Sequence, residues 1–118
     1  FQRWHQRIFE DAATFKGRLA DDKSRNFIFA AHVVTQYLLA AGLPSERFAA
    51  VLDNNQDKIG KRLYGHDLFV RAPAAIKGVD RPIVVLRTGV YDDEIASQLI
   101  AVNPGVVILR AARNATVT

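Results

Sequence analysis

A chain of 118 residues, 49% of them hydrophobic, is long enough to bury the core of one domain and too apolar to be intrinsically disordered. The formal net charge is +4, but the 16 Lys and Arg residues are scattered and form no basic stripe with interleaved aromatics, so we expect no nucleic-acid partner. The absence of Cys excludes disulfides and thiolate metal sites, and no apolar run is long enough to span a membrane, so we expect a cytoplasmic protein.

The first 22 residues predict a helix that precedes the domain core. Apolar residues recur there at three- and four-residue steps, as on one face of a helix: Phe1, Trp4, Ile8, Ala12, Phe15 and Leu19. We expect the helix to end between Leu19 and Asp22, and its apolar face to cover either the sheet of this domain or a neighbouring domain. Because the chain begins at Phe1 and contains no Met, we expect residues 1–118 to be a single domain from a longer protein.

Short apolar runs alternate with helical patterns from residue 26 to residue 110, the predicted α/β core. Five runs are predicted strands: residues 26–31, 47–53, 68–70, 82–89 and 106–109. Helices are predicted over residues 32–42, which end in a typical Gly stop, and 91–102, which carry acids in the first turn. A short helical turn opens at Pro73. The alternation predicts a Rossmann-like three-layer sandwich, with a mostly parallel five-stranded sheet in the order 3-2-1-4-5 and the leading helix on one face.

Polar residues after the predicted strands mark a candidate ligand site. In an open parallel sheet, ligands bind beyond the carboxyl ends of the strands, where the strand order reverses. Ala30-Ala31-His32 and Asp53-Asn54-Asn55 follow two neighbouring strands at that edge. His32 suits a hydrogen bond to an anion or a sugar there, and the alternative is that it only starts the helix. The loop 53–65 carries three cations that either face a polar ligand or are merely solvated.

The sequence matches two known ligand-binding motifs only in part. Asp53 lies 22 residues after Ala31, near the spacing of the acid that holds a ribose in dinucleotide-binding folds. The turn over residues 30–35 reads AAHVVT and lacks the G-x-G-x-x-G glycines, which disfavours tight NAD binding. The string DNNQDKIGKRLY resembles a calcium loop, but Lys58 stands where Gly is needed and Tyr64 where Glu is needed, so we expect no metal.

Three strings in order add a resemblance: FIFAAHVVTQYLLAAGL, VLDNNQDKIGKRLYGHDLFV and VVLRTGVYDDEIASQLIAVNPGVVIL. They resemble the C-terminal domain of S-adenosylmethionine-dependent C-methyltransferases and of related sugar or polysaccharide-precursor methyltransferases. The family pattern hDNxxxKxGKxxxGTxhxV is matched by Asp53, Asn54, Lys58, Gly60, Lys61, Gly65 and Val70, and Y-x-x-E-I by Tyr91, Glu94 and Ile95. The resemblance covers about residues 26–109, and the chain departs from it at Ala30, where the family usually has Gly, and at His66, where it has Thr.

The resemblance implies a substrate-side accessory domain that is not catalytic alone. S-adenosylmethionine would be bound by a separate upstream methyltransferase domain, and this domain would hold no cofactor. The implied substrate is a nucleotide-linked sugar or a similar metabolite, whose diphosphate the loop cations would neutralise and whose hydroxyls Asp53 and Asn54 would bind. The candidate substrate- or nucleotide-binding residues are His32, Asp53, Asn54, Lys58, Lys61, Arg62, Tyr64 and Tyr91. No catalytic residue and no metal ligand is predicted.

Two other functions stay open. One is a non-catalytic scaffold or dimerisation domain, in which the face formed by Phe1, Trp4, Ile8 and Phe15 makes the interface of a homodimer. The other is a degenerate NAD-type nucleotide-binding domain, which needs a close approach of the ligand to the backbone at residues 30–31.

Overall fold

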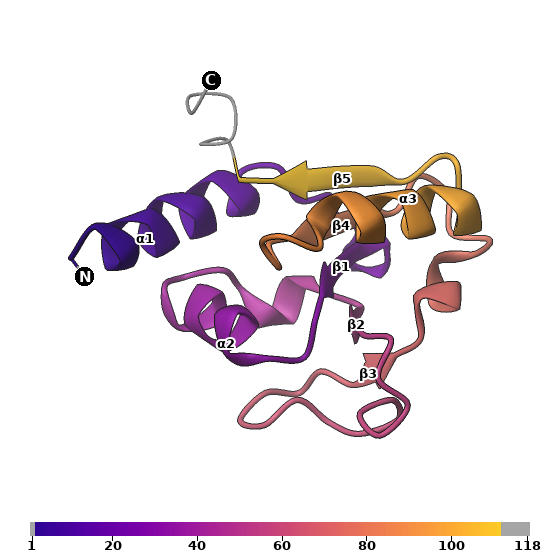
Figure 1. Ribbon diagram of the computed structural model, residues 1–118, viewed down its shortest axis with the longest axis horizontal. Coiled ribbons are helices and arrows are strands. Elements are labelled where there is room, and N and C mark those ends of the chain that lie inside the picture. The colour runs from indigo at the N-terminus through magenta and orange to yellow at the C-terminus, as the bar shows by residue number, and fades with distance from the viewer. Residues whose placement is uncertain (1, 112–118) are drawn as a thin grey trace.

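The computed structural model describes residues 2–111, with side chains from residue 6 onward. The strands are β1 (Asn26–Phe29), β2 (Ala50–Leu52), β3 (Val70–Arg71), β4 (Ile83–Leu86) and β5 (Val107–Arg110). The helices are α1 (Gln2–Lys16), α2 (Val33–Ala40) and α3 (Asp92–Val102), with short 3-10 turns η1 (Lys23–Arg25), η2 (Ser45–Arg47) and η3 (Pro73–Ile76). All strand pairs are parallel, in the order β3-β2-β1-β4-β5, which confirms the predicted α/β fold and strand order (Figure 1).

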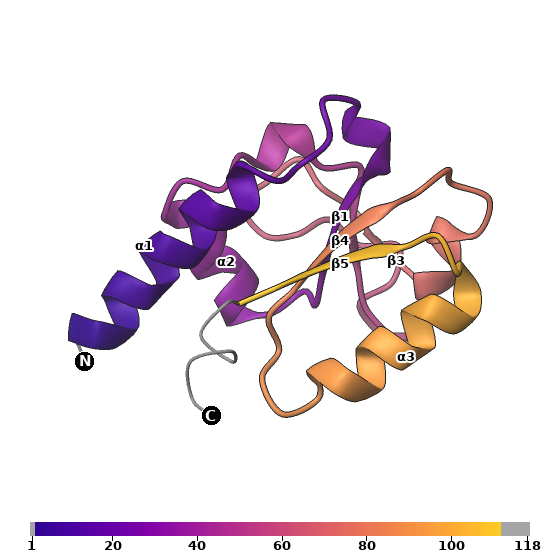
Figure 2. The same ribbon diagram turned by 90° about the horizontal axis from the view of Figure 1, so that it is seen from above.

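Two apolar cores lie on the two faces of the sheet. Ile28 of β1 belongs to the core under α1 and α2, whereas Phe27 and Phe29 belong to the core under α3 and η3. Figure 2 shows α1 and α2 on one side of the strands and α3 on the other. Because both faces are covered, the central strands are apolar along their whole length, as the sequence pattern indicates.

The leading helix covers this domain's own sheet. Ile8, Ala12 and Phe15 are buried in the first core, so the predicted apolar face packs inside the domain. The Arg87 guanidinium Nε lies 2.6 Å from the Asp11 carboxylate, and their side chains are only 10% and 13% exposed, which ties α1 to the residue that follows β4. Phe1 and Trp4, which the sequence assigns to the same face, lie outside the described side chains.

Helix ends follow local signals more closely than the apolar pattern suggests. The predicted end of α1 between Leu19 and Asp22 is wrong, because the helix stops at Lys16 and Gly17 begins a turn. The predicted stop at Gly42 is confirmed, since this residue has φ +117° and the next N–H donates to the Leu38 carbonyl at 3.1 Å. That pattern is a Schellman C-cap, which satisfies two helix carbonyls that would otherwise be unpaired.

A buried amide aligns the start of the central strand. Asn26 has no exposed surface, and its Nδ2 donates to the carbonyls of Ala20 at 2.8 Å and Arg47 at 2.9 Å. Its Oδ1 accepts the Ala20 N–H at 2.9 Å. One side chain therefore joins the segment after α1, the turn before β2 and β1 itself.

We expect Asn26→Ala to lower the free energy of unfolding by about 2 kcal/mol, because it leaves two partly buried backbone groups, the Ala20 N–H and the Arg47 carbonyl, without partners. The Ala20 carbonyl keeps its hydrogen bond from the Arg47 guanidinium at 2.8 Å. Urea unfolding followed by circular dichroism measures the change. Gln56→Ala, in an exposed loop position, is the matched control and should stay within about 0.5 kcal/mol of the parent chain. Equal midpoints for the two variants would contradict the role given to Asn26.

Candidate functional site

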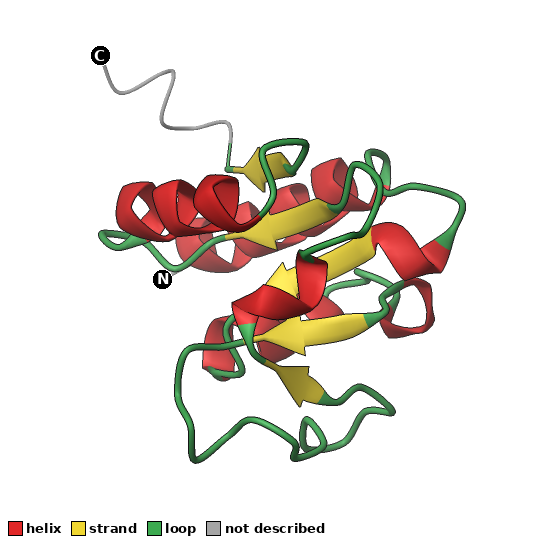
Figure 3. Cartoon of the chain, turned by 90° about the vertical axis from the view of Figure 1, so that its right-hand side faces the viewer, coloured by secondary structure: helices red, strands yellow, loops and turns green. Residues whose placement is uncertain are grey.

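The connection between β2 and β3 is a long loop that takes the place of a crossover helix (Figure 3). Its second half folds into a hairpin-like turn, in which the Leu63 N–H donates to the Leu68 carbonyl at 2.7 Å and the Val70 N–H to the Lys61 carbonyl at 2.8 Å. Leu63 and Leu68 are buried in the core under α2. The loop thus seals the sheet beside α2 and leaves its polar residues at the carboxyl edge of the strands.

The Asp53 carboxylate holds the start of this loop. Its Oδ2 accepts the Ala31 N–H at 2.8 Å and its Oδ1 accepts the Asn55 N–H at 2.9 Å, so both oxygens have backbone partners. The 22-residue spacing between Asp53 and Ala31 therefore corresponds to a direct contact between the ends of β2 and β1. Asp53, a predicted ligand for sugar hydroxyls, lines neither of the two pockets described below.

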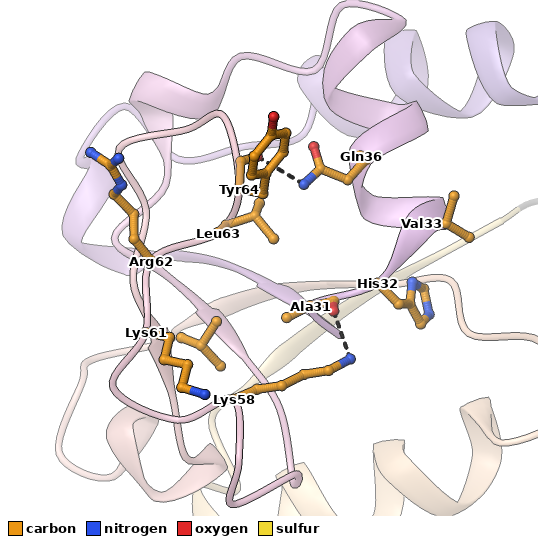
Figure 4. Close-up of a pocket in the computed structure, with 10 residues that line it drawn as sticks. Ala31, His32, Val33, Gln36, Lys58, Lys61, Arg62, Leu63 and Tyr64 are labelled. Atoms are coloured by element: carbon orange, nitrogen blue, oxygen red, sulfur yellow. Dashed lines mark hydrogen bonds between the residues drawn. The ribbon is translucent and has the colours of Figure 1, made fainter.

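The first pocket, here called the α2 pocket, has a volume of about 410 Å³ and lies between the N-terminus of α2 and the loop (Figure 4). It brings together five of the predicted site residues, one from the start of α2 and four from the loop: His32, Lys58, Lys61, Arg62 and Tyr64. The remaining lining residues are Ala31, Val33, Gln36, Leu63 and Val70.

Two polar side chains of the α2 pocket are fixed by the backbone. The Lys58 ammonium donates to the Ala31 carbonyl at 2.8 Å, and Figure 4 shows its side chain reaching across to that residue. His32 is the N-cap of α2, and its Nδ1 accepts the Val34 N–H at 3.2 Å, which leaves Nε2 as the ring's remaining hydrogen-bonding atom. His32 therefore has the helix-start role that the sequence leaves open, and its ligand role stays a prediction.

The other two cations of the α2 pocket, Lys61 and Arg62, lie nearer to the solvent than Lys58. Lys61 and Arg62 are exposed, and in Figure 4 the Arg62 side chain extends away from His32 and Ala31. Tyr64 is 90% exposed, and its carbonyl accepts a hydrogen bond from the Gln36 side chain at 2.9 Å. An anion in the α2 pocket would therefore meet Lys58 inside and Lys61 at the rim, beside the positive end of α2.

The second pocket, here called the α3 pocket, also measures about 410 Å³ and is lined by Asn54, Tyr91, Glu94, Ile95 and Gln98. The Asn54 and Gln98 amides exchange two hydrogen bonds, with N–O distances of 3.0 Å and 2.8 Å. None of its lining side chains is a cation. The structure thus divides the predicted site residues, because Asn54 and Tyr91 lie in a different pocket from the cations.

The turn after β1 has few free backbone donors. Ala30 has φ +88°, the left-handed region that favours glycine, at the position where the resemblance expects Gly. The N–H groups of Ala30, Ala31 and Val34 are bonded to Leu52, Asp53 and His32. In dinucleotide-binding folds, groups at this turn contact the pyrophosphate. Three backbone N–H groups of this turn are therefore already used within the chain.

Sequence reasoning missed Gln36 and Gln98. Gln36 follows His32 by four residues, and Gln98 follows Glu94 by four, so each lies on the same helix face as a residue that the sequence had singled out. Helical spacing from His32 and from the Y-x-x-E-I motif was the signal that would have found them.

Comparison of the chain with protein-family models, with curated proteins and with solved structures finds no match. Within residues 2–111, no helix is both long enough and apolar enough to cross a membrane. The same part of the chain contains no group of three or more His, Asp or Glu side chains placed to bind a metal ion.

We expect Asp53→Ala to destabilise the chain by about 2 kcal/mol, because the Ala31 and Asn55 N–H groups lose a charged acceptor. Urea unfolding measures the stability, and amide hydrogen exchange at residues 31 and 55 reports the lost bonds. Asp57→Ala removes an exposed carboxylate from the same loop without touching these N–H groups and is the control. Unchanged exchange at residue 31 in Asp53→Ala would show that the contact does not hold the edge.

Proposed function

We propose that this chain is the substrate-side accessory domain of an S-adenosylmethionine-dependent methyltransferase that acts on a nucleotide-linked sugar or a similar metabolite. The methyl donor would be bound by a separate upstream domain. The observation that carries the proposal is the α2 pocket, which collects Lys58, Lys61 and Arg62 beside the N-terminus of a helix at the ligand-binding edge of a parallel sheet.

The charges of the α2 pocket suit a diphosphate. Each ammonium or guanidinium group favours a phosphate oxygen by a charge-assisted hydrogen bond, and the helix dipole adds to the same potential. Lys58 is partly buried and already oriented by its bond to Ala31, so it has remaining N–H donors whose positions cost little entropy to fix. The backbone of Ala30 also favours the resemblance, because its conformation is the one that a glycine would adopt there.

Binding of the methyl donor by this domain itself is disfavoured. The N–H groups of Ala30, Ala31 and Val34 are bonded within the chain, and there is no glycine-rich turn at which a nucleotide could approach the backbone. The same argument weighs against the degenerate NAD-type domain. For the scaffold alternative, Ile8 and Phe15 are buried inside the domain and are not available to a second copy, which leaves only Phe1 and Trp4 of the proposed interface.

An NMR titration of the isotope-labelled chain tests the proposal. We expect UDP-glucose to shift amide signals of residues 58–64 and of His32, because the diphosphate would neutralise the cations there. S-adenosylmethionine, which carries no phosphate, should leave these signals unchanged, and NAD, whose diphosphate would meet the same cations, should bind no more tightly than UDP-glucose. Saturable binding of S-adenosylmethionine at residues 30–32, or tighter binding of NAD than of UDP-glucose, would replace the proposal with a cofactor-binding role, and silence for every ligand would favour a scaffold.

Charge reversal distinguishes binding in the α2 pocket from a general effect of the net charge of the chain. We expect the double variant Lys61→Glu/Arg62→Glu to weaken UDP-glucose binding at least about tenfold, since two attractive charges become repulsive. Both side chains are exposed, so the thermal unfolding curve should change little. The control Arg18→Glu/Lys23→Glu makes the same change in net charge near the opposite edge of the sheet, and equal affinities of the two double variants would count against the proposal.

A further inference from the structure

We propose that the α3 pocket is a separate binding site for an uncharged, hydroxylated ring of the sugar type. It lies at the same edge of the sheet as the α2 pocket but is formed by other residues, since the two sets of lining residues have no member in common. Its volume of about 410 Å³ falls within the range of sites for small ligands. The inference does not require the α2 pocket to bind an anion.

Charge selects the class of ligand. Glu94 is the only ionisable acid or base among the five lining residues apart from the weakly acidic Tyr91 phenol, and no Lys or Arg is present. A phosphate or carboxylate would meet the Glu94 carboxylate without a compensating cation from the lining, whereas a hydroxyl group can donate to that carboxylate. The charged side chains that line the two pockets therefore have opposite signs, and the α3 pocket disfavours the anionic groups that the α2 pocket attracts.

The amide pair supplies ordered hydrogen-bonding groups. Asn54 and Gln98 each use one N–H and one carbonyl lone pair on the other, at 3.0 Å and 2.8 Å, so each keeps one N–H donor and further acceptor capacity. The reciprocal bonds restrict both side chains before any ligand arrives, which lowers the entropy lost on binding. Hydroxyl groups both donate and accept, and therefore fit such an alternating edge without leaving a polar atom unpaired.

Tyr91 supplies a flat apolar surface beside these amides. It is 61% exposed although its side chain lines a pocket, and it makes no capping bond to α3. Its backbone is anchored by the next residue, because the buried Asp92 carboxylate accepts the Thr88 N–H at 2.7 Å and the Thr88 hydroxyl at 2.6 Å. An exposed aromatic ring on a fixed backbone offers a face against which the C–H groups of a sugar ring can stack.

An NMR titration with methyl α-glucoside, which carries no charge, tests the inference. We expect shifts centred on Asn54, Tyr91 and Gln98, with a dissociation constant of about 1–10 mM, typical of a ligand with few buried atoms. Inorganic pyrophosphate should not shift these three residues. If methyl α-glucoside leaves all three unchanged up to about 100 mM, or if pyrophosphate shifts them instead, the inference is wrong.

Matched variants locate the binding. Tyr91→Ala and Gln98→Ala should each weaken methyl α-glucoside binding at least about fivefold, which corresponds to a loss of roughly 1 kcal/mol of binding free energy. Tyr91→Phe should change the affinity less than about twofold, because the face of the ring is kept. Tyr64→Ala makes the same truncation at an exposed tyrosine of the α2 pocket and should have no effect. Equal affinities of Tyr91→Ala and Tyr64→Ala would overturn the inference.

The two proposals fail separately. The double variant Lys61→Glu/Arg62→Glu should bind methyl α-glucoside like the parent chain, because neither residue lines the α3 pocket. Glucoside binding in the α3 pocket without UDP-glucose shifts in the α2 pocket would support this inference and contradict the proposed function. Amide shifts at Asn54 and Gln98 with uridine, but not with methyl α-glucoside, would assign the pocket to a base and overturn the inference.

Discussion

The arrangement of the site depends on the Asp53 carboxylate. It binds the Ala31 N–H with one oxygen and the Asn55 N–H with the other, directly after β2 ends. These bonds join the carboxyl ends of two neighbouring strands and set the direction in which the loop leaves the sheet. From that fixed point, Asn54 reaches the Gln98 amide on α3 while Lys58 reaches back to Ala31 beside α2. The Asp53 carboxylate therefore fixes the start of the loop that supplies residues to both pockets.

Ala31 is held by the loop at both ends of its backbone. Asp53 accepts its N–H, and the Lys58 ammonium donates to its carbonyl. In a dinucleotide-binding fold, this turn would stay open for a pyrophosphate, but here the protein's own acid and base occupy it. Asp53 and Lys58, which match the methyltransferase family pattern, thus have a structural role in the isolated domain. The charges left for a ligand in the α2 pocket are the remaining Lys58 donors, Lys61 and Arg62.

The sequence predicts the sheet better than it predicts the site. Apolar runs and helical spacing report burial, so the five strands, their parallel order and the stop at Gly42 follow from them. The end of α1 does not, because Leu19 continues the apolar pattern after the backbone has turned at Gly17. The division of the site residues into two pockets could not be predicted either. The direction of Asn54 depends on its hydrogen bonds to Gln98 of α3, and that of Lys58 on its hydrogen bond to Ala31 after β1, and both partners are distant in the sequence.

In the loop between β2 and β3, buried and exposed side chains alternate with a period of two residues. Leu68 and Val70 are buried while Phe69 between them is exposed, and Leu63 is buried between the exposed Arg62 and Tyr64. This is the alternation of paired extended chains, whereas a crossover helix would repeat every three to four residues. Inward positions complete the core beside α2, and the others are free to carry charge. Cations can therefore gather at the edge of a buried parallel sheet without a charge entering its core, because the leucines of the same loop provide the seal.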